Sequence, residues 1–373
     1  MLAAAMLRPR RTFARMVPCF LSVPGEDRAV RLCSMLTAEG PHRFLIRSDD
    51  DRALHSGIPP LPVRVDAQGP WCAAPGRTTL APMTSRRNPS NRDREQAPPQ
   101  APKVEFEETT PYDAYVRAST LATLQRTATD DPGEYMFLVL SQIMELYFNL
   151  IAFEWRTAQR FLREDRLGEA LLALRRSVDH FRGLNASWTS FTWMTPSDFN
   201  AFRPALGEAS GFQSFLYRHL EFLLGFKDPA LLRPHKHLAG DHYAQLVAAY
   251  EAPSLYDDAL AYLARQGYAV PQAVLDAEIA RTHEWDEGVE DAWVKVYEDT
   301  DHGDPMRQLA DALTDIASQF SDWRYWHLMA VRRAMGAKGG TGGSAGLAWL
   351  ERSLQRQAFP ELWSAPSCRP RLR

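Results

Sequence analysis

Apolar residues recur at spacings of three and four from Val104 to the C-terminus, and this periodicity constrains the fold more than any other feature. Such spacing places apolar side chains on one face of a helix. No run alternates between polar and apolar residues for long enough to indicate a sheet. We therefore expect an all-α helical bundle over residues 104–373. Helices are predicted at Tyr112–Gln125, Gly133–Glu164, Leu167–Thr195, Ser197–Leu206, Phe212–Leu224, within Leu238–Gln266, and at Pro271–Arg281, Val289–Tyr297 and Pro305–Met335.

Residues 1–103 have a different character, because no periodicity persists there and Pro, Arg, Ser and Gly recur. This composition is typical of disorder, so we predict a disordered extension. Two alternatives stay open. Met83 stands shortly before the periodic region, so the extension could come from a mis-assigned upstream start. The Arg-rich beginning, with a short apolar run broken by Pro18, could also be a transit or signal segment.

The stretch "YMFLVLSQIMELYFNLIAF", residues 135–153, is almost long enough and apolar enough to cross a membrane. It is interrupted by polar residues, whereas a spanning helix needs about 20 predominantly apolar residues. A carboxylate in hydrocarbon is costly, so we predict no membrane span. Ser141, Glu145 and Asn149 follow at i, i+4 and i+8 and share one helical face. We expect this polar face to point into the bundle.

Charge and cysteine content narrow the classes of partner. The formal net charge is -3, which provides no clustered basic surface for nucleic acid or an anionic membrane, so a small molecule is the expected ligand. The four cysteines form no CxxC pair, which argues against structural zinc. The long middle region without cysteine suits a reducing compartment, and we expect a cytoplasmic protein.

Histidine is the first residue type to consider as a ligand or a base. His327 lies in "SDWRYWHLMAVRRAMG", a predicted helix that ends at Gly336. It is either a core histidine satisfied by one hydrogen bond or an axial ligand of iron. His235 and His237, in "LRPHKHLAGDHY", are expected to be exposed on a loop rather than to bind a metal.

Two further segments have residue types suited to a small polar ligand. "GAKGGTGGSAG" surrounds Thr341 with glycines but lacks the Gly-Lys-Ser/Thr order of a nucleotide loop. It is either a flexible linker or a mobile loop that closes over a ligand. Arg203 follows Phe199 and Phe202 in a mostly apolar segment. It is either exposed or inward facing, where it would pair with the carboxylate of an aromatic amino acid.

Several sequence blocks together resemble the tryptophan 2,3-dioxygenase superfamily, whose members are heme enzymes that oxidise the indole ring. The resemblance runs from about Thr110 to Trp363. It is carried by "YDAYVRASTLATLQ", "DDPGEYMFLVLSQIMELYF", "MTPSDFNAFRPALGEASGFQSFLYRHLEF", "YEAPSLYDDAL", "WRYWHLMAVRRAMGAKGGTGGSAG" and "FPELW". It implies a helical heme domain, heme b with ferrous iron in the active form, O2 as co-substrate and a tryptophan-like substrate.

The resemblance also implies roles for particular residues. His327 matches the histidine that ligates the heme iron, and Ser210 matches a serine beside the heme. Arg203 matches the arginine that binds the substrate carboxylate, and Thr341 matches the threonine that contacts the amino acid end. Phe137 and Phe199 match the aromatic walls around the indole. Tyr112, Tyr115 and Val116 match a helix that in relatives reaches into the pocket of a neighbouring subunit, which implies a homotetramer.

Ser141 departs from the family pattern, because typical members have histidine there to accept a hydrogen bond from the indole NH. A serine oxygen can accept that bond but is no imidazole base. We therefore predict Ser141 as a catalytic residue of a monooxygenase that forms a 2-oxindole from tryptophan or a substituted, for example β-methyl, tryptophan with an external reductant. The alternatives are a tryptophan 2,3-dioxygenase that forms N-formylkynurenine, and a heme or tryptophan sensor without turnover.

Overall fold

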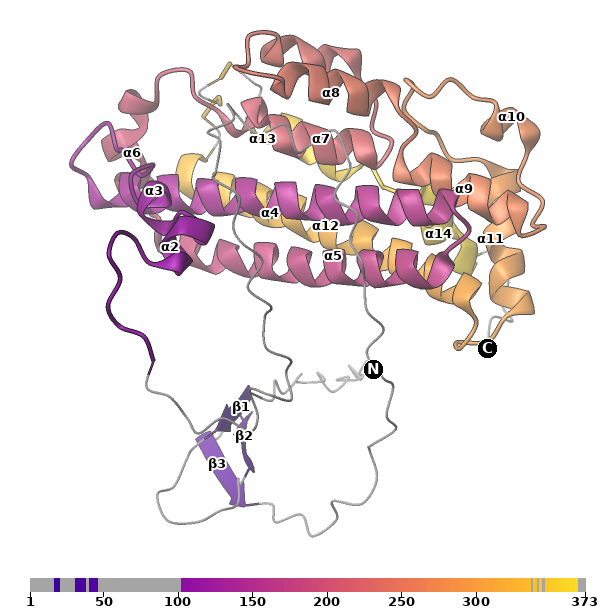
Figure 1. Cartoon of the computed structure of the whole chain (residues 1–373), viewed down its shortest axis with the longest axis horizontal. Helices are drawn as coiled ribbons and strands as arrows, with labels where there is room; N and C mark the ends of the chain where they lie inside the picture. The colour runs from indigo at the N-terminus through magenta and orange to yellow at the C-terminus, as the bar shows by residue number, and fades with distance from the viewer. Residues whose placement is uncertain are drawn as a thin grey trace, which may run out of the picture. The chain divides into compact units, whose positions relative to one another are not determined.

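A computed structural model of the chain describes residues 17–20, 31–37, 40–45, 102–336, 338–340, 342–343 and 346–367. The chain divides into two units, Met1–Gln100 and Ala101–Arg373. This division lies three residues from the predicted boundary between 103 and 104. Each unit is described by itself below (Figure 1).

The described residues of the first unit form a three-stranded antiparallel sheet that the sequence did not predict. Its strands are β1 (Val17–Phe20), β2 (Arg31–Thr37) and β3 (Gly40–Leu45), in the order β1-β2-β3. Val17 pairs with Ser34, and Leu32 pairs with Leu45. Most of the expected disordered extension lies outside the described residues, so that expectation stays a prediction.

The second unit is all-α, as predicted, over its described residues. Its α-helices are α2 (Pro111–Val116), α3 (Ala118–Leu121), α4 (Pro132–Arg163), α5 (Leu167–Ser187), α6 (Pro196–Phe202), α7 (Phe215–Leu223), α8 (His242–Glu251), α9 (Leu255–Arg265), α10 (Gln272–Leu275), α11 (Glu287–Asp299), α12 (Pro305–Met335), α13 (Leu347–Leu354) and α14 (Pro360–Ser364). Its 3-10 helices are η1 (Trp188–Trp193), η2 (Arg203–Leu206), η3 (Gly211–Gln213), η4 (Pro229–His235) and η5 (Ala365–Ser367).

Three long helices, α4, α5 and α12, run alongside one another and form the body of the bundle (Figure 1). α5 packs against both α4 and α12, while α7 and α9 pack on α4. Side chains from all three long helices are fully buried, among them Trp155, Phe181 and Leu313. Removing this apolar surface from water is the main force that holds the helices together.

Local sequence signals explain where several helices begin and end. Thr195 caps α6 as predicted: its hydroxyl accepts from the Asp198 backbone N–H, the Asp198 carboxylate accepts from the Thr195 N–H, and Pro196 is the first helical residue. The predicted helix Tyr112–Gln125 is interrupted, because Arg117 adopts a left-handed backbone with φ 60° between α2 and α3. The predicted helix Pro271–Arg281 is shorter, with only α10 formed.

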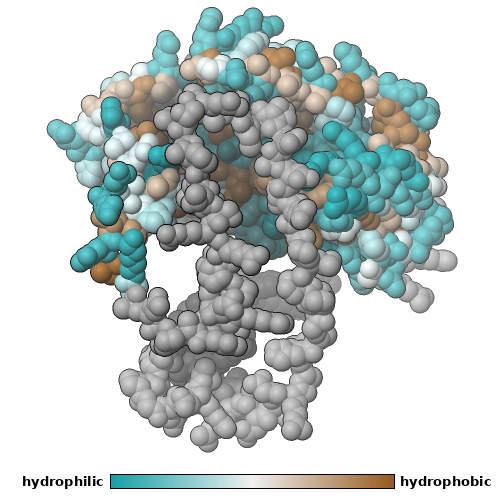
Figure 2. All heavy atoms as spheres, viewed as in Figure 1, coloured by the Kyte–Doolittle hydropathy of each residue, from teal (hydrophilic) through white to brown (hydrophobic). Residues whose placement is uncertain are grey.

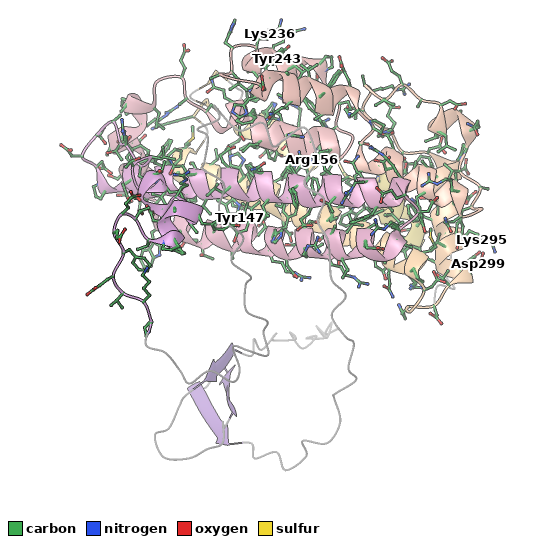
Figure 3. The ribbon with its side chains drawn as sticks, in the orientation of Figure 1. Tyr147, Arg156, Lys236, Tyr243, Lys295 and Asp299 are labelled. Carbon is green, nitrogen blue, oxygen red and sulfur yellow. The ribbon has the colours of Figure 1, made fainter. Side chains whose placement is uncertain are left out.

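α4 is long and apolar enough to cross a membrane by length and composition. It nevertheless has polar partners within the fold. Glu154 is buried and accepts two hydrogen bonds from Arg176 on α5, and Arg156 approaches His219 on α7 at 3.1 Å (Figure 3). Hydrophilic residues surround smaller apolar patches on the visible face of the unit (Figure 2). These contacts tie one side of α4 to α5, α7 and α9.

α4 and α5 approach each other closely at Gly183. A Cβ at that position would lie 2.6 Å from the hydroxyl oxygen of Tyr147, which projects from α4 toward α5 (Figure 3). Only glycine fits without a shift of the tyrosine side chain. Glycine at this position therefore lets α4 and α5 pack closely together.

Candidate functional site

A cavity of about 470 Å³ lies between α4, α6, α7, α12 and α13. Its volume falls within the range of about 300–1,000 Å³ that is usual for small-molecule and cofactor sites. The wall is mainly apolar and aromatic, with few polar groups. The lining side chains that bear on function are Phe137, Ser141, Glu145, Trp188, Phe199, Ser210, Tyr217, Trp323 and His327.

His327 enters this cavity from α12. Its imidazole stacks on Trp188, with ring centroids 5.6 Å apart and an angle of 18°, and lies 5.2 Å from the Trp323 ring. Neither ring nitrogen has a hydrogen-bond partner among the described residues, which is compatible with a ligand role; that role stays a prediction. Burial, assisted by the charge of Arg218, lowers the pKa of His327 to about 4. The imidazole is therefore neutral and able to bind a metal.

The residues of the cavity fit a heme. A neutral imidazole with a free nitrogen is the usual axial ligand, and aromatic walls suit a large planar group. The described residues contain no cluster of three or more His, Cys, Asp or Glu that could hold a metal ion alone. One protein ligand would suffice for heme, because the porphyrin itself supplies four nitrogen ligands to the iron.

Ser141 and Phe137 stand one turn apart on α4 and both line the cavity, as predicted. The Ser141 hydroxyl donates to the Phe137 carbonyl at 2.8 Å. Its proton is therefore engaged, while the oxygen lone pairs stay free to accept a hydrogen bond. The Phe137 ring lies 6.0 Å from that of Phe199 and 5.5 Å from that of Phe202, which gives an aromatic wall beside the serine.

Arg203 begins η2 and is half-buried beside the cavity, not in its wall. One guanidinium nitrogen donates to the Gly339 carbonyl at 2.8 Å, which ties η2 to the glycine-rich segment. A guanidinium has five N–H donors, so others remain available for a carboxylate. Thr341 lies outside the described residues, so its predicted contact with a substrate stays a prediction.

Ser210 lines the cavity and caps η3, where its hydroxyl accepts from the Phe212 backbone N–H. The glycine-rich segment passes directly over it. A Cβ at Gly342 would lie 2.8 Å from the Ser210 Cβ, so glycine is required for this approach. The segment therefore has a packing role next to the cavity, beyond that of a linker.

Glu145 lines the cavity. From the sequence we predicted that it lies on the inward polar face of its helix, but we assigned it no role. Burial raises its pKa, and a hydrogen bond from Ser214 partly opposes that shift. Asn149 is exposed, which contradicts the expectation that the polar face continues inward. The reason is geometric: eight residues of a 3.6-residue helix overshoot two turns by about 80°.

Other predicted positions lie away from the cavity. Tyr112 and Tyr115 on α2 are 67% and 89% exposed, and Val116 is also exposed, so none of them reaches the cavity of its own chain. Their predicted role at a neighbouring subunit stays a prediction. His237 is exposed as expected, but His235 is only 1% exposed, because it lies in η4 and not on an open loop.

An all-α bundle with one neutral, cavity-facing imidazole among aromatic walls defines a heme-binding protein. Comparison with known sequences agrees: the tryptophan 2,3-dioxygenase family model matches residues 97–267 and 248–368. The tryptophan 2,3-dioxygenase of Bordetella parapertussis is 38% identical over 261 residues, which cover 70% of this chain and 92% of that protein. That of Ralstonia pickettii is 37% identical over the same share of this chain and 94% of its own length.

The chain therefore belongs to the tryptophan 2,3-dioxygenase family. Members of this family depend on heme and use O2, and the chain is a heme-dependent oxidoreductase. The resemblance read from the sequence blocks is confirmed. The geometry adds that His327, Ser141, Phe137, Phe199 and Ser210 surround one cavity.

Proposed function

We propose that the chain uses heme and O2 to oxidise the indole ring of L-tryptophan or a close derivative. The observation that carries this proposal is the free imidazole of His327 in the same cavity as Ser141, Phe137 and Phe199. His327 would bind the iron, and heme supplies the oxidation chemistry when bound. The names of the relatives, which are tryptophan 2,3-dioxygenases, support tryptophan as the substrate.

Other side chains in and beside the cavity would position the substrate. Phe137 and Phe199 would hold the indole between aromatic faces, and the free lone pairs of Ser141 would accept a hydrogen bond from the indole NH. Arg203 would bind the carboxylate with N–H groups that its contact to Gly339 leaves free. Positioning of this kind lowers a reaction barrier because the reactants no longer lose freedom in the encounter.

The first candidate outcome is dioxygenation, in which both atoms of O2 enter the product and the ring opens to N-formylkynurenine. It is supported by the names of the relatives, two of which match nearly their whole length. This outcome needs no external reductant, because both oxygen atoms are retained by the substrate. It replaces the 2-oxindole prediction as our main proposal.

The second candidate outcome is monooxygenation to a 2-oxindole, and Ser141 is the observation that favours it. A hydroxyl whose proton is held by the Phe137 carbonyl is a weaker positioning group than an imidazole and cannot act as a base near neutral pH. One oxygen atom would enter carbon 2, and the other would leave as water after taking two electrons and two protons from an external reductant. The smaller side chain would also leave room for a β-methyl group.

Mass spectrometry of the product formed under ¹⁸O2 separates the two outcomes. The heme-loaded, reduced protein is mixed with L-tryptophan or β-methyltryptophan, with and without ascorbate. Dioxygenation predicts N-formylkynurenine with two labelled atoms, independent of ascorbate. One labelled atom in a 2-oxindole that forms only with ascorbate would establish the second candidate. Tight tryptophan binding without any oxygen uptake would leave the sensor alternative and contradict both.

We also propose a homotetramer in the cytoplasm. The exposed aromatic residues Tyr112 and Tyr115 support an assembly in which α2 reaches a neighbouring site, and Leu146, Leu150 and Phe153 form a second exposed apolar row on α4. Contact with another copy would remove these side chains from water. Sedimentation velocity measures the state directly, and a monomer at micromolar concentration would contradict it.

A further inference from the structure

A cluster of buried charged residues stands behind His327 and has no role in the proposed function. Arg218 and Glu221 on α7 are each 1% exposed, and Arg324 on α12 is 2% exposed. The Glu221 carboxylate accepts from Arg218 through one oxygen and from Arg324 through the other, the latter at 3.0 Å. Arg324 also donates to the Tyr217 hydroxyl at 3.0 Å.

The cluster has one positive charge more than its carboxylate neutralises. Two guanidinium groups face a single carboxylate, and the Tyr217 hydroxyl is neutral because burial raises its pKa. Arg324 uses its remaining donors on the Ser353 and Arg356 carbonyls, at 3.0 and 2.8 Å. Arg218 lies over aromatic rings and donates to the Phe212 carbonyl at 3.5 Å, while its buried Nε has no partner among the described groups. These further partners are neutral carbonyl groups, so they do not compensate the excess positive charge of the cluster.

This charge lies next to the predicted iron ligand. A small cavity of about 20 Å³ is lined by Arg218, Arg324 and His327 together with aromatic residues that also line the larger cavity. Arg324 precedes His327 by three residues on α12, so the two lie on the same side of the helix. Water is largely excluded there, and a charge in such surroundings acts over a longer distance than at the surface.

We propose that the Arg218–Glu221–Arg324 cluster raises the reduction potential of a heme held by His327 and so favours its ferrous form. The inference rests on the proposed function, because it requires heme at His327. Oxidation adds a positive charge at the iron, and a nearby uncompensated positive charge opposes that addition. Burial and charge around the axial ligand are among the ways by which proteins set heme potentials.

Spectroelectrochemical titration of the heme-loaded full chain tests this inference with two variants of opposite sign. Arg218→Gln removes the excess charge, so its midpoint potential should fall. The ferrous-to-ferric ratio at fixed potential should fall about tenfold, which is about 59 mV for one electron. Glu221→Gln removes the compensating charge, so its potential should rise. Arg218→Lys keeps the charge and should restore a potential near that of the unchanged chain.

Arg163→Gln is the matched control, because it also removes one arginine from an ion pair, and Arg163, which is half exposed and paired with the buried Asp258, lines neither cavity. Shifts of opposite sign in the Arg218→Gln and Glu221→Gln variants, with no shift in the control, support the inference. Equal potentials, or shifts of the same sign, overturn it and indicate a purely structural cluster.

The ferrous Soret spectrum, recorded on each sample, separates this inference from the proposed function. If the chain binds heme through histidine but the midpoint potentials of the Arg218→Gln and Glu221→Gln variants are unchanged, only the inference is contradicted. Failure of the unchanged chain to bind heme contradicts both. Should Arg218→Gln not fold, the upward shift predicted for Glu221→Gln carries the test alone, and its absence overturns the inference.

Discussion

The two sides of the cavity differ in how firmly the fold holds them. On the ligand side, His327 stacks on the Trp188 ring, contacts the tilted Trp323 ring and lies near the buried Arg218–Glu221–Arg324 cluster. On the substrate side, within the part of the chain that the structure describes, Ser141 bonds only to its own helix, and Arg203 donates one hydrogen bond to the glycine-rich segment.

This difference corresponds to the two functions of the site, which are to hold the iron and to bind and release the substrate. An iron ligand must keep one orientation, so a dense set of buried contacts suits the ligand side. A substrate must enter and leave, so few and replaceable contacts suit the opposite side. Substitutions on the substrate side should therefore change affinity and product while heme binding persists.

The largest effect expected on the substrate side is that of Arg203→Ala. It removes a charge-assisted hydrogen bond worth about 1.5–3 kcal/mol, so KM for tryptophan should rise about 10- to 150-fold. Steady-state kinetics measure it, with Arg182→Ala as a control, because Arg182 forms an exposed pair with Asp179. A KM equal to that of the control would show that the carboxylate is bound elsewhere.

A smaller effect is expected at Ser141. Ser141→Ala removes the acceptor for the indole NH and should raise KM about 2- to 13-fold, the effect of one hydrogen bond of about 0.5–1.5 kcal/mol. Ser141→His introduces an imidazole and should increase the fraction of N-formylkynurenine wherever a 2-oxindole is also formed. Chromatography of the products measures that fraction. Identical kinetics and products in all three chains would remove Ser141 from the site.

The smallest effect concerns stability and Glu145. Burial raises its folded pKa above the ordinary value of 4.5, so its stabilising contribution is fully present below that pH and is lost as pH rises through the folded pKa. Glu145→Gln cannot ionise and should gain thermal stability over the unchanged chain as pH increases from about 4 to 8. A difference in Tm that stays constant across this range would contradict the raised pKa.

The long helices were predictable from the sequence, whereas interruptions were not. Pro305–Met335 agrees with α12, and the predicted 133–164 helix agrees with α4 within one residue. Their length gives many apolar positions at one period, so the signal is strong. The break at Arg117 depends on a single left-handed residue that is not glycine, which leaves no mark in the apolar pattern.

The sequence predicted cavity residues where a block matches the family pattern, as for His327 and Phe199, and where one position departs from it, as for Ser141. The charged cluster was not predicted. Arg218 and Glu221 stand three residues apart, a spacing that ordinarily indicates an exposed helical face. Only the packing of α7 against α4 and α12, together with the ends of neighbouring helices, shows that they are buried. Likewise, Glu145 was recognised as part of a polar face but not as a cavity residue.

Titration of the purified full chain with hemin, followed at the Soret band, tests most directly whether the cavity binds a heme through His327. The unchanged chain should bind one heme per chain with the spectrum of histidine ligation. His327→Ala should lose this binding and regain it when imidazole is added, because free imidazole can occupy the space of the missing ring. Stoichiometric heme with an unchanged spectrum in His327→Ala, without imidazole, would contradict the assignment.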